Sequence, residues 1–310
     1  MLLWLLCAGT PGSELLARQL PAAATLDAFI ADSVAADELR ILRSNALALQ
    51  DDDDDVLTAL LSPLYADGFQ RPRRALTVIS DARVHGKAHR KVDDLPGSAE
   101  ALLSDLRSTS SHSCIGWYEM LSGGLEAMGA LQPPFVRSDA NRRLFSTVAQ
   151  ASRALASAMR RPFGEVTAHV YISAPGTSAL VNHTDDYAVV ALALQGAKEW
   201  RVCRHERKAC MGEAVPAEEA AALDCEIIRL LPGDILYLPR GLVHSAAATD
   251  TGSAHIAIAI PPDERESAEL WWGCLPDWLE REVTRSLQWG LLGALGLLAV
   301  GYAFPQFRLL

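Results

Sequence analysis

The sequence predicts an α+β protein built around an antiparallel double-stranded β-helix, a cupin-like jelly roll, with a helical N-terminal region and a C-terminal helix. Two observations support this fold class. From residue 165 onward, short apolar runs alternate with Gly and Pro turns, which is typical of an antiparallel sandwich or barrel. Before residue 160, apolar residues recur at helical spacing. The composition, 50% hydrophobic and 21% charged, is that of a globular protein.

The elements follow from periodicity and turn residues. Helical spacing predicts helices within residues 22–61 and 98–131 and over 141–159, with a strand over 75–84. Seven strands are then expected, over residues 165–173, 186–194, 197–203, 225–231, 235–239, 243–248 and 253–260. The dipeptide at 195–196, "QG", is expected to be a tight turn. We therefore divide the chain into a mainly helical region (1–130), a β-domain (131–265) and a C-terminal helical segment (266–310).

The charge pattern narrows the class of partner. The formal net charge is −10, and half of it comes from the aspartate run at 51–55, which is typical of a solvated loop. An acidic body disfavours direct nucleic-acid binding and suits a basic protein or peptide. The six cysteines form no C-x-x-C pair, so the sequence indicates neither a zinc ribbon nor a disulfide framework and favours a reducing compartment.

The two ends contain apolar runs. Residues 287–304 carry no charge and are long enough to form a membrane-spanning helix, and a buried or dimerising helix explains them equally well. A tail anchor and a homodimer are therefore both open. The apolar run near the start has no basic residues before it, which disfavours a secretory signal.

A metal site is predicted from three residues. His183 and Asp185 lie two apart at the mouth of an expected strand, so both side chains face the same side. The stretch "LPGDILYLPRGLVH" turns twice and brings His244 back toward that mouth. Two histidines and one carboxylate form the facial triad that binds Fe(II) in non-haem oxygenases. Zinc or nickel in the same ligands, or hydrogen-bonded core histidines, are the alternatives.

Lys198 is the second unusual residue. It begins the strand expected after the "QG" turn, from which its amine can reach into the barrel. A buried lysine needs an anion, and a dicarboxylate chelating the metal at one end would offer its far carboxylate there. A surface lysine on an edge strand is the alternative.

These motifs resemble a known family. "HVYISAPGTSALVNHTDDYAVVALALQGAKEWRV" followed by "LPGDILYLPRGLVHSA" is similar to the JmjC-type ribosomal oxygenases over about residues 131–262. The resemblance implies an Fe(II)- and 2-oxoglutarate-dependent dioxygenase that uses O₂. Family members hydroxylate histidines of ribosomal proteins, and some are described as histone lysine demethylases that regulate chromatin, so a nuclear or nucleolar location is implied.

The resemblance also assigns residues to roles. The triad would bind iron, Lys198 would bind the 5-carboxylate of 2-oxoglutarate, and Tyr171 would face the same pocket. Two positions depart from the family pattern: His169 stands where asparagine is usual, and Ala259 stands where a serine helps to hold the co-substrate. Trp200 and the "PRG" turn favour the ribosomal type.

Two other functions stay open at this point. One is a catalytically silent JmjC-like binding module, which the changes at His169 and Ala259 favour. The other is a JmjC hydroxylase with a different target, such as asparagine, lysine or tRNA. The family continues into a helical dimerisation region and a winged helix, whereas little sequence follows residue 262, so the winged helix is expected to be missing.

Overall fold

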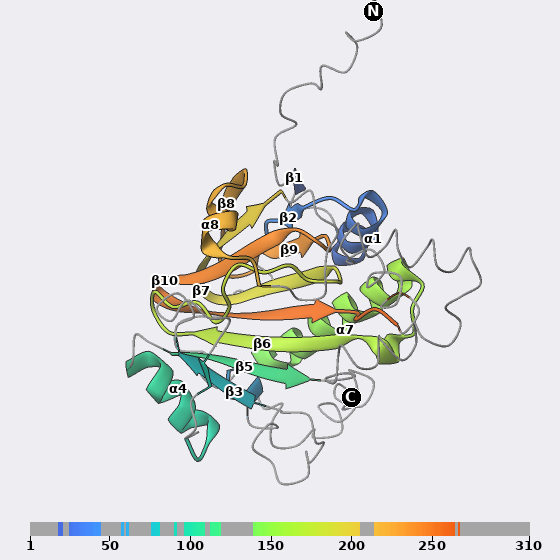
Figure 1. Cartoon of the computed structure of the whole chain (residues 1–310). Coiled ribbons are helices and arrows are strands. Elements are labelled where there is room, and N and C mark those ends of the chain that lie inside the picture. Colours follow the sequence, from blue (N-terminus) through green and yellow to red (C-terminus); the bar gives the residue numbers. More distant parts are fainter. Residues whose placement is uncertain are drawn as a thin grey trace, which may run out of the picture. The chain divides into compact units, whose positions relative to one another are not determined.

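The protein is represented by a computed structural model that describes most of the region from residue 139 to 263 and parts of the chain before it (Figure 1). Backbone and side chains are described for residues 25–44, 57–58, 60–61, 96–108, 142–204, 214–263 and 266. Backbone alone is described for residues 18–20, 76–80, 90–91, 112–118 and 139–141. Residues 1–262 form one compact unit and residues 263–310 a second.

Among the described residues, helices and strands are interspersed before residue 139, and strands dominate after residue 166. The helices are α1 (Leu26–Ala36), α4 (Ala99–Ser108), α7 (Asp139–Met159), the short 3₁₀ helix η1 (Phe163–Glu165) and α8 (Ala217–Ala221). The N-terminal strands are β1 (Arg18–Leu20), β2 (Arg40–Leu42), β3 (Leu76–Ser80), β4 (Arg90–Lys91) and β5 (His112–Tyr118). The later strands are β6 (Thr167–Ser173), β7 (Val189–Cys203), β8 (Cys225–Leu230), β9 (Ile235–Leu238) and β10 (Val243–Ala259).

The strands form one sheet in the order β1-β2-β9-β7-β10-β6-β5-β3-β4, with β8 paired to β7. All pairs are antiparallel except β1 with β2. The long strands β6, β7 and β10 lie side by side, and α7 runs behind them (Figure 1). The predicted fold class is confirmed: the chain has a cupin-like, jelly-roll α+β fold.

The "QG" dipeptide is not a turn, which corrects the prediction made from the sequence. Strand β7 continues through Gly196 without a turn, so the two strands predicted on either side of it are one. Strand β10 also joins two strands that were predicted separately. Gly196 has a φ of +63°, and the β7–β10 register shifts beside it, so this glycine forms an irregularity that bends the strand. β7 pairs with β9 before the irregularity and with β8 after it.

The two faces of β7 have different surroundings. Val190, Leu192 and Leu194 pack into a core shared with the helices α1, α4 and α7. Val189, Ala191 and Trp200 belong to a second apolar cluster, with residues of β2, β8, β9 and β10. The two-residue period of a strand separates Val189 and Ala191 from Val190, Leu192 and Leu194. Trp200 has the same parity as Val190 but belongs to the second cluster, because the irregularity at Gly196 lies between them. The second face lines a cavity.

Two helical predictions in the N-terminal region are only partly right. The helix expected within residues 98–131 ends at Ser108, and residues 112–118 form β5, which pairs with β3 and β6. The helix expected within 22–61 begins after the cap at Thr25, whose hydroxyl accepts a hydrogen bond from the Ala28 N–H, and gives way to β2 at Arg40. The strand expected over 75–84 and the helix expected over 141–159 are confirmed as β3 and α7.

The domain division proposed from the sequence stays a prediction. The structure adds that β2 and β5, from the N-terminal region, are strands of the same sheet as β6 to β10. Within the described part of the chain, no helix has the length and apolar character needed to cross a membrane. The possible membrane or dimerisation helix at 287–304 lies outside the described residues.

The cysteine prediction is wrong at one pair. Cys203 at the end of β7 and Cys225 at the start of β8 are directly opposite each other and form a disulfide, with Cα atoms 3.9 Å apart. The spacing of 22 residues has no C-x-x-C signature, because the pairing depends on strand register rather than on proximity in the sequence. The disulfide closes the end of the β7–β8 ladder.

Candidate metal centre and adjoining cavity

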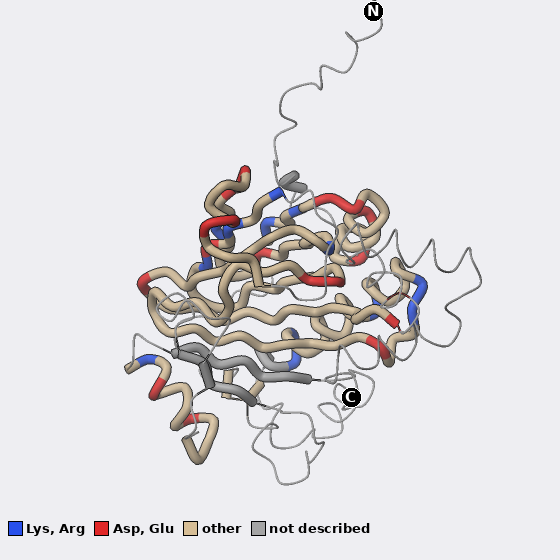
Figure 2. The backbone as a smooth tube through the Cα atoms, in the orientation of Figure 1, with Lys and Arg blue, Asp and Glu red and all other residues tan. Residues whose placement is uncertain are grey.

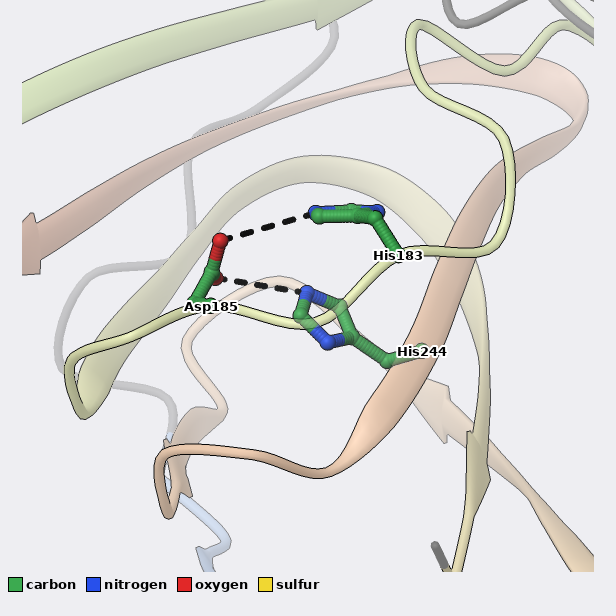
Figure 3. A group of neighbouring side chains, drawn as sticks. All are labelled: His183, Asp185 and His244. Carbon is green, nitrogen blue, oxygen red and sulfur yellow. Dashed lines mark ion pairs between the residues drawn. The ribbon is translucent and has the colours of Figure 1, made fainter. Parts of the chain in front are cut away.

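The structure brings His183, Asp185 and His244 together (Figure 3). One ligand atom from each residue lies within 4.8 Å of the others. The Asp185 carboxylate faces both rings, with Oδ1 3.8 Å from His183 Nε2 and Oδ2 3.6 Å from His244 Nε2. The two imidazole centroids are 4.2 Å apart.

Hydrogen bonds from the Nδ1 atoms fix the orientation of both histidine rings. The ring Nδ1 of His183 lies 2.8 Å from the carbonyl oxygen of Val181, and Nδ1 of His244 lies 3.0 Å from that of Leu242. A carbonyl can only accept, so each Nδ1 carries the proton and donates it. Each Nε2 is then left with a lone pair directed at the centre, as in a metal-binding histidine.

The protonation state of His244 suits a metal ligand. The pKa of His244 is lowered to about 4, mainly by burial and also by the neighbouring His183, against the opposite effects of the Asp185 carboxylate and the hydrogen bond to the Leu242 carbonyl. The ring is therefore neutral at neutral pH. Two imidazole nitrogens and one carboxylate are a donor set that fits Fe(II) and also fits other divalent metal ions.

A cavity of about 260 Å³ adjoins the three residues. Its wall is mostly apolar and comes from β6, β7, β10 and the loop between β6 and β7. The lining residues are His169, Tyr171, Ala179, Leu180, Val181, His183, Asp185, Tyr187, Val189, Lys198, Trp200, Ala214, His244, Ala246, His255, Ala257 and Ala259. Strand β6 contains no Asp, Glu, Lys or Arg, and β10 contains only Asp250, so the charged groups in this cavity are exceptional (Figure 2).

Lys198 lies inside the cavity and is only 4% exposed, so it is not a surface lysine. Its Nζ is 3.2 Å from Ser173 Oγ and 3.4 Å from His255 Nδ1. Burial lowers the pKa of its amine to about 7, because the charged form loses its hydration. Among the residues that the structure describes, Lys198 forms no ion pair. An incoming carboxylate would supply the missing opposite charge.

The other predicted site residues also line this cavity. Tyr171 lies 6.4 Å from His169 and 4.7 Å from His255, measured between ring centroids. Burial lowers the pKa of His169 to about 4, an effect that the Asp185 carboxylate opposes. Trp200 stacks on His244 at 6.0 Å, and Ala259 contributes a methyl group to the wall. The structure gathers all eight predicted residues in one cavity, and their roles stay predictions.

Sequence reasoning missed the two hydrogen-bond partners of Lys198, Ser173 and His255, and Ser253, which pairs with Ser173. The available signal was alternation in "SAHIAIAI", where His255 shares a face with Ala257 and Ala259, and in "HVYIS", where Ser173 shares a face with Tyr171. Nothing in the sequence alone shows that these faces meet around Lys198. The pairing of β6 with β10, which puts Ser173 opposite Ser253, supplies that information.

The residues present fit both a metal ion and a dicarboxylate. The metal end has the donor set described above, and the Lys198 end has a buried amine. The hydroxyl of Ser253, on the same face as Ser173, is also buried and has no hydrogen-bond partner within the described part of the chain. A buried hydroxyl without a partner is costly, which favours a polar ligand at this end.

The part of the chain that carries the His-Asp-His site is similar to known proteins. Residues 144–267 match the family model described as the JmjC domain. Ribosomal oxygenase 1 of Gallus gallus is 31% identical over 177 residues, which cover 53% of this chain and 27% of that protein. The bifunctional lysine-specific demethylase and histidyl-hydroxylase NO66 of Dictyostelium discoideum is 33% identical over 102 residues, 30% of this chain and 19% of that protein.

Among solved structures, E. coli ycfD matches with a TM-score of 0.44 and 15% identity, over 74% of this chain and 51% of that chain. This likeness is too distant to support an argument about function. The matches to the two curated relatives span only about a quarter and a fifth of those proteins.

Proposed function

We propose that the chain is an Fe(II)- and 2-oxoglutarate-dependent oxygenase that modifies a protein side chain. The observation that carries this proposal is the cavity itself, which has the triad on its wall and a buried amine without an ion-pair partner among the described residues. A metal-chelating acid with a second carboxylate would satisfy both. The JmjC family match covers the same residues.

Different residues of the cavity would bind the metal, bind the co-substrate and exclude water. His183, Asp185 and His244 would hold Fe(II) on one side and leave positions for 2-oxoglutarate and O₂. Lys198 would bind the far carboxylate and thereby orient the acid. The apolar wall would exclude water. Iron, 2-oxoglutarate and O₂ together supply the oxidising power that places an oxygen atom on a substrate C–H bond, with succinate and CO₂ as co-products.

The proposed substrate is a basic protein or peptide, either a ribosomal protein with a target histidine or a histone tail with a methylated lysine. The names of the curated relatives support these two classes. The net charge of −10 suits a basic partner. Hydroxylation of an N-methyl group leads to loss of formaldehyde, so one site would serve both outcomes. A nuclear or nucleolar location and a role in chromatin regulation would follow from such substrates.

Mass spectrometry of candidate substrates tests the proposal. Ribosomal proteins and histones would be incubated with the protein, Fe(II), ascorbate and 2-oxoglutarate, with Asp185→Ala as the control. We expect one added oxygen atom on a histidine, or loss of a methyl group from a lysine, with the wild-type protein only. If neither ribosomal proteins nor histones are modified, the proposed substrates are wrong. If no succinate is formed either, the silent binding module is favoured.

A further inference from the structure

Among the described residues, the amine of Lys198 has two hydrogen-bond partners, and it can form a third hydrogen bond. An ammonium group has three protons to donate. Ser173 Oγ accepts one at 3.2 Å, and His255 Nδ1 lies 3.4 Å from the same nitrogen. Because an ammonium has no lone pair, the protonated amine can only donate to His255, so Nδ1 is the acceptor. The third proton is left for a ligand in the cavity.

The ring of His255 is held from two sides. It stacks on Tyr171 with centroids 4.7 Å apart and planes 6° apart. It also meets Trp200 edge to face at 5.5 Å and 73°. The residue is 5% exposed, and burial holds the pKa of its imidazole well below the usual value, with the nearby Lys198 acting in the same direction. A neutral, immobilised ring therefore offers Lys198 a fixed acceptor.

Lys198 and His255 line the cavity, and Ser173 lies behind them as a hydrogen-bond partner of the amine. Ser253 lies directly opposite Ser173 on the neighbouring strand, so both face the same side of the sheet, and the Ser253 hydroxyl has no hydrogen-bond partner among the described residues. A carboxylate placed here would accept from Lys198 and from such a hydroxyl. Its presence would also resolve the cost of burying the amine without an anion.

We propose that His255 is a positioning residue for Lys198, which it holds so that the cavity selects a 2-oxo acid with a second, distal carboxylate. The inference rests on the proposed function and names a determinant of co-substrate choice within it. His255 acts through Lys198 and does not touch the reacting atoms. Without the acceptor, the long lysine side chain would lose one of its two fixed partners and would be less well placed for a carboxylate.

Two substitutions separate the acceptor from the ring. His255→Asn keeps a polar atom at the position of Nδ1 and removes the ring. His255→Phe keeps the ring and removes the acceptor. Binding would be measured by calorimetry on Mn(II)-loaded protein, with 2-oxoglutarate and with 2-oxobutyrate, which has no distal carboxylate. This readout does not depend on turnover.

We expect His255→Phe to bind 2-oxoglutarate about tenfold more weakly than the wild-type protein, since a hydrogen bond to a charged group is lost. His255→Asn should stay close to the wild type, and the affinity for 2-oxobutyrate should change little in either variant. If His255→Phe binds 2-oxoglutarate as the wild type does, the inference is wrong. It is equally wrong if His255→Asn alone is impaired, because the ring would then matter only for packing.

Controls keep this outcome separate from failure of the proposed function. Each variant must bind Mn(II) like the wild type, and if His255→Phe does not, His255→Leu replaces it as the variant without an acceptor. A wild-type protein that binds Mn(II) but not 2-oxoglutarate would overturn the proposed function itself. If the wild type binds 2-oxoglutarate and the variants without an acceptor bind it equally well, only the role proposed for His255 is wrong.

Discussion

The backbones of His183 and His244 exchange two hydrogen bonds: the His183 N–H donates to the His244 carbonyl at 2.9 Å, and the His244 N–H donates to the His183 carbonyl at 2.8 Å. Two residues far apart in the sequence are thus joined by a single antiparallel bridge at the candidate metal site. Because this bridge is made by main-chain atoms, the two rings are placed before any ion arrives. The site is therefore preorganised for binding.

Substitution of Asp185 should remove the metal site without unfolding the protein. In Asp185→Ala we expect Mn(II) affinity to fall by about a hundredfold or more, because the two imidazoles lose the anionic ligand between them. The melting temperature without metal should change little. Asp186→Asn, in the same turn but outside the cluster, is the matched control and should bind Mn(II) normally. Equal losses in both variants would contradict the assignment.

Binding of 2-oxoglutarate should take up a proton above pH 7. The pKa of Lys198 is about 7 in the unliganded protein, so the amine is charged below that pH and increasingly neutral above it. A distal carboxylate needs the ammonium, so affinity should be flat below pH 7 and fall by up to about tenfold per pH unit above it. Calorimetry in buffers of different ionisation enthalpy measures the uptake. The Lys198→Met variant should show no proton uptake from this residue. An affinity of the wild type that does not change with pH would refute the prediction.

The irregularity in β7 should tolerate only glycine. A β-carbon on Gly196 would lie 2.1 Å from the Gly252 carbonyl oxygen, on a residue that already has a φ of +63°. We expect Gly196→Ala to lower the free energy of unfolding by about 3 kcal/mol, from strain and overlap together. Gly176→Ala has a similar φ, +68°, but open space around the β-carbon, and should cost about 1 kcal/mol. Chemical denaturation measures both, and equal losses would show that the overlap is relieved.

The disulfide between Cys203 and Cys225 should stabilise the oxidised protein. It closes a 22-residue separation, for which the entropy of the unfolded chain predicts about 3 kcal/mol. Reductant should therefore lower the melting temperature of the wild type. The double variant Cys203→Ser/Cys225→Ser should start lower and should not respond to reductant. Mass spectrometry that finds both thiols free in the oxidised wild type would contradict the pairing.

Most of the strands after residue 165 and the clustering of the three candidate metal ligands were predictable, because they depend on alternation and turn residues. The two-residue period put His183 and Asp185 on one face, and the Gly and Pro turns brought His244 back to them. The turn predicted at Gly196 was wrong for a physical reason. A glycine with positive φ occurs both in hairpin turns and at irregularities within a continuous strand, and the pairing with the neighbouring strand decides between them. β10 pairs with β7 on both sides of Gly196 and so keeps it continuous.

The surroundings of Lys198 were not predictable from the sequence. Its partners Ser173 and His255 come from β6 and β10, and their meeting depends on strand order and register. The disulfide has the same origin, since Cys203 and Cys225 meet through the β7–β8 register. Long-range register is set by packing of the whole sheet, which no local pattern contains.

Succinate formation from 2-oxoglutarate tests the central claim most directly. The Fe(II)-loaded protein would be given O₂, 2-oxoglutarate and peptides from ribosomal proteins and histones, with His244→Ala in parallel. We expect succinate from the wild type that depends on iron and on O₂, and none above background from the variant. A wild-type protein that binds metal and 2-oxoglutarate yet forms no succinate would show that the chain is a binding module rather than an oxygenase.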